Sequence, residues 1–160
     1  MSKSQWMLLL TLAASSYDVG TIWMVQIGYR LWPYVAPNDF DAYHGAWWLK
    51  IIPVVFPVAA LALFGSMAMI WWRPSGVMPT PLWLNVILQL ATPALTLALW
   101  GRWQAQTHFA RLVDGTLDPT YARIMGTHWI RVALITANGL LALWMMIEHL
   151  SSRTSSLASH

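Results

Sequence analysis

The sequence contains no cysteine and few charged residues. Without cysteine, disulfides, thiolate metal sites, iron–sulfur clusters and a cysteine nucleophile are all excluded. Only 9% of the residues are charged, and the net charge of +3 is spread thinly along the chain, so there is no basic patch of the kind that binds nucleic acid. A glycine-rich phosphate loop, a HExxH pattern and a Ser/His/Asp constellation are also missing. The composition therefore argues against nucleic-acid binding and against several common enzyme classes.

Apolar residues dominate what remains. Hydrophobic residues make up 58% of the 160 positions, more than a water-soluble globule of this size can bury, so we expect a lipid bilayer to be the main partner. Four segments are long enough to cross a hydrocarbon core, which takes about 20 helical residues. We place them near residues 6–30, 46–72, 81–107 and 128–149. The predicted fold is all-α, a bundle of four transmembrane helices in a single domain (1–150), with a polar, disordered tail (151–160).

Prolines and turn residues mark the ends of these spans and one bend. The first span is predicted to end near Pro33, and Asp39 to cap a short helix leading into the second. Pro53 and Pro57 lie inside the second span and predict a kink. The link before the last span, residues 110–126, carries the turn signal Asp118-Pro119. Short links make successive spans antiparallel neighbours.

A polar stripe runs along the third span. Its members, which recur at helical spacings of four, three, four and four, are Asn85, Gln89, Thr92, Thr96 and Trp100, and Gln104 and His108 extend it at the same spacing. A polar stripe is costly against lipid, so we expect it to face the bundle interior. Asp18 lies at mid-depth in the first span, where an ionisable group is paired, protonated or functional. Asn85, Gln89 and Asn138 are the expected partners, in a structural hydrogen-bond network or a proton relay.

Most candidate site residues fall on one edge of the predicted membrane domain. Gln104 and His108 are four residues apart, and His128 and Arg131 three apart, so each pair can share a helix face. A cavity between tryptophans and a few polar groups suits a flat lipophilic molecule. In the catalytic interpretation His128 is the base, His108 a second proton carrier, and Arg131 and Gln104 hold a substrate oxygen. The expected binding residues also include Trp100, Trp103, Gln26, Trp47 and His44.

Two other interpretations of the same residues stay open. The polar groups can snorkel to headgroup phosphates and cap helix ends. Alternatively, His44, His108 and His128 can supply three imidazole ligands to a metal, or two of them can hold a haem, although their spacing matches no known metal signature. We predict no cofactor from the sequence, with haem and metal as open alternatives.

Two segments carry a resemblance to known proteins. In a four-span layout, residues 19–26 (VGTIWMVQ) and 127–136 (THWIRVALIT) look like uncharacterised small bacterial four-helix membrane proteins. These are distantly similar to the anthrone-oxygenase-like membrane family, in which a histidine and an arginine three residues later open the last span, as His128 and Arg131 do here. The resemblance implies a bacterial inner-membrane enzyme that oxygenates lipophilic aromatic compounds without a metal or organic cofactor. The alternative is a non-catalytic accessory or scaffold subunit, whose tryptophan-rich surfaces contact a partner protein or a second copy of the chain.

Overall fold

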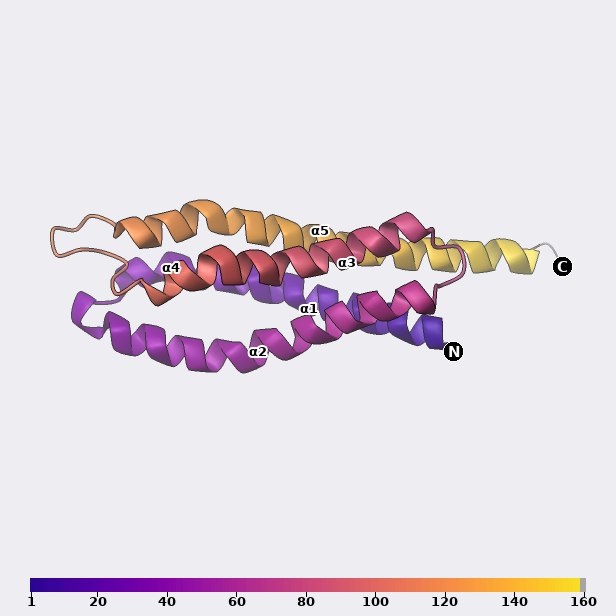
Figure 1. The fold of residues 1–160 in the computed structure, drawn as a ribbon, viewed down its shortest axis with the longest axis horizontal. Coiled ribbons are helices and arrows are strands. Elements are labelled where there is room, and N and C mark those ends of the chain that lie inside the picture. Colours follow the sequence, from indigo (N-terminus) through magenta and orange to yellow (C-terminus); the bar gives the residue numbers. More distant parts are fainter. Residues whose placement is uncertain (159–160) are drawn as a thin grey trace.

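The computed structural model of the protein describes residues 1–158, and over this range it is a bundle of long helices without β-strands (Figure 1). Four helical segments are long and apolar enough to cross a membrane, which confirms the predicted all-α, four-span membrane fold. The N-terminus and the last part of α5 lie at the same end of the bundle. The elements are α1 (Lys3–Leu31), η1 (Trp32–Tyr34), α2 (Pro37–Trp71), α3 (Pro79–Leu95), η2 (Thr96–Trp100), α4 (Gly101–Ala105) and α5 (Pro119–Ala158).

The helices surround a core that is divided in two. α1 packs against α2 and α5, and α3 packs against the same two helices, so α1 and α3 lie diagonally across the bundle. One apolar cluster lies toward the links at residues 32–36 and 106–118 and is centred on Tyr29 and Trp32; the other lies toward the chain termini, around Leu8 and Met145. Buried polar side chains lie between them. Each apolar cluster holds one end of the bundle together, and the middle is left for polar groups.

Two glycines allow α1 to approach its neighbours closely in the terminal half of the bundle. A Cβ atom on Gly65 of α2 would lie 2.5 Å from Thr11 Oγ1, and one on Gly139 of α5 would lie 2.6 Å from Val19 Cγ2. Side chains on these residues would force the helices apart. α1 is therefore held tightly at this end on both sides.

The starts of α2 and α5 differ from the predicted span boundaries. α2 is one continuous helix that begins at Pro37, and no side chain caps its N-terminus. The prediction that Asp39 caps a separate short helix is therefore wrong. Asp39 instead lies in the first turn, where a carboxylate complements the helix dipole. α5 begins at Pro119, because Asp118 Oδ1 accepts hydrogen bonds from the backbone N–H groups of Thr120 (2.8 Å) and Tyr121 (2.9 Å). Both helices extend beyond their apolar segments.

The third span is continuous but irregular. After Pro93, near the end of α3, the helix widens into the π-helical turn η2, in which the Gly101 N–H bonds to the Thr96 carbonyl, and then tightens into α4. Four residues slightly exceed one α-helical turn, so a stripe spaced by four drifts around a regular helix. The wider π turn offsets this drift. As a result Trp100 and Gln104 are both buried, on the predicted inward face.

The tail was predicted to be disordered, which is wrong for residues 151–158. α5 continues through Ala158, and the Ser152 hydroxyl donates to the His149 carbonyl at 2.8 Å. This segment contains no glycine or proline that would end the helix, and its composition alone was a poor guide. Residues 159 and 160, the remainder of the predicted tail, lie outside the described range.

A candidate binding cavity between the helices

α1, α2, α3, α4 and α5 line a cavity of about 290 Å³. An apolar cavity of about 150 Å³ is enough to bind benzene, so this one has room for a molecule of about two rings. Most of the wall is apolar or aromatic and comes from Val25, Tyr29, Trp47, Trp48, Ile51, Val55, Phe56, Leu63, Leu88 and Ile135. A few polar side chains interrupt it, namely Asp18, Thr21, Gln89, Thr92, Thr96, Gln104, Arg131 and Asn138. An apolar pocket with few polar groups is the usual form of a small-molecule site.

Both α2 and α3 contribute wall residues that are exposed on the outside of the bundle. α2 bends near its middle (Figure 1), in the part of the helix that contains Pro53 and Pro57. Phe56, between these prolines, lines the cavity and is still 50% exposed. Pro93 on α3 likewise lines the cavity and is exposed on the outer face of the bundle. Part of the cavity wall is therefore formed by residues that also reach the outer face of the bundle.

Arg131 is the charged group at one end of the cavity. Its side chain is 9% exposed, and the guanidinium carbon lies 4.6 Å from the centroid of the Trp100 ring. Trp100 is fixed in turn by a 3.0 Å hydrogen bond from its Nε1 to Thr127 Oγ1. Within the described residues, neither Nε nor Nη2 of Arg131 has a hydrogen-bond partner. The Trp100 ring and the nearby Tyr29 hydroxyl compensate this buried cation only in part, and no carboxylate within the described residues forms an ion pair with it.

Tyr29 lies at the same end of the cavity and connects several of the candidate residues. Its hydroxyl accepts a hydrogen bond from Gln104 Nε2 of α4. The Tyr29 ring packs against Trp32 and Trp47, with centroid separations of 4.5 and 5.4 Å, and edge-on against His128 at 4.8 Å. Aromatic neighbours on several sides fix the position of the ring.

His128 and Gln26 are brought together as expected, but they do not line the cavity. His128 is fully buried, and its Nδ1 donates to Gln26 Oε1 at 2.5 Å, leaving Nε2 without a partner. His44 is also buried outside the cavity wall, 4.9 Å from Trp32 and stacked on Phe40. His128 therefore packs behind the wall residue Tyr29, whereas His44 packs against rings that do not line the cavity.

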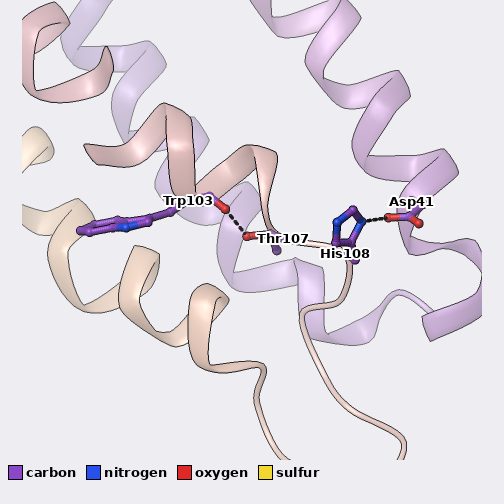
Figure 2. A network of polar contacts seen from close by, with 4 residues as sticks. All are labelled: Asp41, Trp103, Thr107 and His108. Carbon is purple, nitrogen blue, oxygen red and sulfur yellow. Dashed lines mark hydrogen bonds and ion pairs between the residues drawn. The ribbon is translucent and has the colours of Figure 1, made fainter. Parts of the chain in front are cut away.

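His108 lies outside the cavity altogether. α4 ends at Ala105, so the helical face that was predicted to carry both Gln104 and His108 does not reach His108. Figure 2 shows its ring directed toward Asp41 of α2, with 3.4 Å between Nδ1 and Oδ1 and both side chains about two-thirds exposed. Trp103 is also outside the cavity and lies 5.6 Å beneath the Arg123 guanidinium. The predicted grouping of His108 with His128 and Arg131 is wrong.

Asp18 lines the same cavity as Arg131, in the polar middle layer of the bundle. The predicted partners of Asp18 hydrogen-bond to one another and to Ser15: Asn85 to Asn138 (2.7 Å), Gln89 to Ser15 (3.3 Å) and Asn138 to Ser15 (3.5 Å). The expected polar network therefore exists, but none of these bonds reaches Asp18. The Asp18 side chain is 8% exposed and its Oδ1 has no partner within the described residues.

Sequence reasoning missed Phe56 as a wall residue and did not place Asp18 beside the aromatic edge. Pro53 and Pro57, on either side of Phe56, were the available signal, because a bend within α2 opens space between this helix and its neighbour. Nothing local to Asp18 indicates that it shares a cavity with Arg131, since the two lie on different helices.

A second hollow, of about 830 Å³, lies at the terminal end of the bundle beside Ser2, Arg73 and His149. It is wide open to the surface. Its one buried titratable side chain, His149, is already engaged, with Nδ1 2.9 Å from the Ser75 carbonyl oxygen. The smaller, more enclosed cavity is the better candidate site because its buried polar groups lack partners.

Comparison of the chain with family profiles, with curated proteins and with solved structures gave no match. Within residues 1–158, no three histidine, aspartate or glutamate side chains come together in an arrangement that can hold a metal ion. Inferences about function therefore depend on the cavity and its residues.

Proposed function

We propose that this multi-pass protein, in the bacterial inner membrane, binds a lipophilic aromatic or quinone-like compound in the cavity, with an oxygen of the compound at Arg131. The single observation that carries the proposal is the buried Arg131 guanidinium, which lines an apolar, aromatic cavity and has two nitrogens without partners. Aromatic walls from Trp47 and Trp48 favour a flat molecule.

No carboxylate of the described residues forms an ion pair with the buried Arg131 guanidinium. A buried ion without its partner costs several kcal/mol, so a free guanidinium inside the bundle favours any ligand that brings an anionic or strongly accepting oxygen. Hydrogen bonds to a charged group contribute about 1.5–3 kcal/mol each, which corresponds to about 10- to 150-fold in affinity. Trp100 holds the guanidinium in place by its ring contact at 4.6 Å, so little reorganisation precedes binding.

Chemistry on the bound compound is the second part of the proposal. The hydroxyl of Tyr29 lines the cavity near Arg131 and is better placed than His128 to exchange a proton with the ligand. His128 and Gln26 then act as positioning residues, because the His128 ring packs against Tyr29. Oxygenation, which the sequence resemblance implies, is the reaction to assay first.

The test is to purify the protein in mild detergent, identify co-purifying small molecules by mass spectrometry, and measure binding of 2-naphthoate and of 1,4-naphthoquinone by equilibrium dialysis. We expect at least one of the two to bind. Arg131→Gln should weaken naphthoate binding by 10-fold or more, and the matched control Arg102→Gln, on an exposed arginine of α4, should leave it unchanged. A folded protein that binds neither compound and elutes with a stoichiometric partner chain would instead support the accessory-subunit hypothesis.

A further inference from the structure

We infer that the ligand is a two-ring aromatic acid with a hydroxyl group at its far end, the acid held by Arg131 and the hydroxyl by Asp18. This inference rests on the proposed function of the cavity and narrows it to a class of compound. Its basis is that a buried guanidinium and a buried carboxyl group line the same apolar cavity, each has a polar atom without a hydrogen-bond partner, and neither forms an ion pair within the described residues.

The immediate surroundings of Asp18 do not supply what its carboxyl group lacks. Three buried polar side chains of the same middle layer, Ser15, Gln89 and Asn138, hydrogen-bond to one another and not to Asp18. Asp18 Oδ1 has no hydrogen-bond partner and the side chain is 8% exposed. An intramembrane acid of this kind is by default a functional group. Because Asp18 lines the cavity, a ligand bound there is able to supply the missing hydrogen bond.

The spacing of the two groups sets the length of the ligand. On the antiparallel helices α1 and α5, Ser15 hydrogen-bonds to Asn138 and Gln26 to His128. Counting from either pair puts Asp18 level with position 135 or 136 of α5, about four or five residues from Arg131, or roughly 6–8 Å along the bundle. Side chains lean toward the N-terminus of their own helix, so these two lean apart and their polar atoms are farther apart still.

Cavity size agrees with this length. The volume of about 290 Å³ is about twice that of a cavity that binds benzene, which leaves room for about two aromatic rings. A naphthalene with substituents at opposite ends, as in 6-hydroxy-2-naphthoate, places a carboxylate at one pole and a hydroxyl at the other. A hydroxyl donor satisfies the Asp18 carboxyl group without bringing a second charge into the apolar cavity.

The test measures binding to the full-length protein in phosphatidylcholine nanodiscs by equilibrium dialysis, with empty nanodiscs to correct for partitioning into lipid. The probes are 6-hydroxy-2-naphthoate, 2-naphthoate, which lacks the hydroxyl, and 6-aminomethyl-2-naphthoate, which replaces it with a cation. We expect the hydroxy acid to bind about 10-fold more tightly than 2-naphthoate. In Asp18→Leu the two should bind equally. This apolar replacement removes an unpartnered carboxyl group and is expected to fold, and Asp41→Asn, on an exposed acid, is the control.

The outcomes separate the two proposals. Equal binding of 2-naphthoate and the hydroxy acid to the wild type, or a preference that survives in Asp18→Leu, overturns the role of Asp18 and leaves that of Arg131 intact. Tighter binding of the aminomethyl compound overturns the hydroxyl in favour of a cation. If neither naphthoate binds the wild type but 1,4-naphthoquinone does, the aromatic acid is overturned and the proposed function stands; if none of these compounds binds, the proposed function itself fails.

Discussion

Replacing Arg131 with methionine should stabilise the empty protein and abolish binding. Methionine is apolar and long enough to fill much of the space of the arginine chain. The change removes a 9% exposed guanidinium whose Nε and Nη2 have no partners, and it also removes the cation–π contact with Trp100. Relief of an uncompensated buried charge is worth several kcal/mol, and the lost contact about 2 kcal/mol. We therefore expect a net stabilisation of about 1–3 kcal/mol.

The assay is thermal unfolding in dodecyl maltoside, followed by far-ultraviolet circular dichroism, with the naphthoate titration run on the same preparations. A gain of 1 kcal/mol raises Tm by about 2–4 °C in a chain of this size, so the expected increase is about 2–12 °C. The matched control, Arg102→Met, removes an exposed arginine and should move Tm by less than about 2 °C. A lower Tm in Arg131→Met would refute the reasoning, because it would mean that the charge is already compensated in the free protein.

Three further predictions concern packing, a loop and the excluded histidine. Gly139→Ala should lower the free energy of unfolding by about 1–3 kcal/mol, because the new Cβ would lie 2.6 Å from Val19 Cγ2. In the control Gly126→Ala, on the same helix, the new Cβ meets nothing within 4 Å and should not destabilise the protein. Chemical denaturation in detergent measures both free energies. Hydrogen bonds from the Thr116 hydroxyl and backbone N–H lower the pKa of Asp114. In Thr116→Val this pKa should therefore rise toward its ordinary value in an NMR titration. The order that these bonds give the loop is present above the ordinary pKa of the carboxyl group and is lost as the pH falls through the lowered pKa. His108→Ala should leave ligand affinity within twofold of wild type, since this ring lies outside the cavity, and a 10-fold loss in equilibrium dialysis would show that the cavity boundary is wrong.

The sequence by itself determined the all-α membrane fold, because hydrophobicity is a property of each residue and the length of an apolar run directly reports whether it spans a bilayer. It also identified the inward face of the third span, since Asn85 and Gln89 repeat at helical spacing and cannot face lipid at low cost. Helix ends were less predictable: α4 ends at Ala105 in a polar region where no proline, glycine or apolar pattern marks a boundary, and this put His108 outside the site.

Only the tertiary structure decided which residues share a cavity. Asp18, Phe56 and Arg131 lie on three different helices, and no spacing along the chain relates them. Their proximity depends on the order of helices around the bundle, on the rotation of each helix and on the bend of α2 near its prolines. These are properties of packing between helices, which the side chains determine jointly and no single segment encodes.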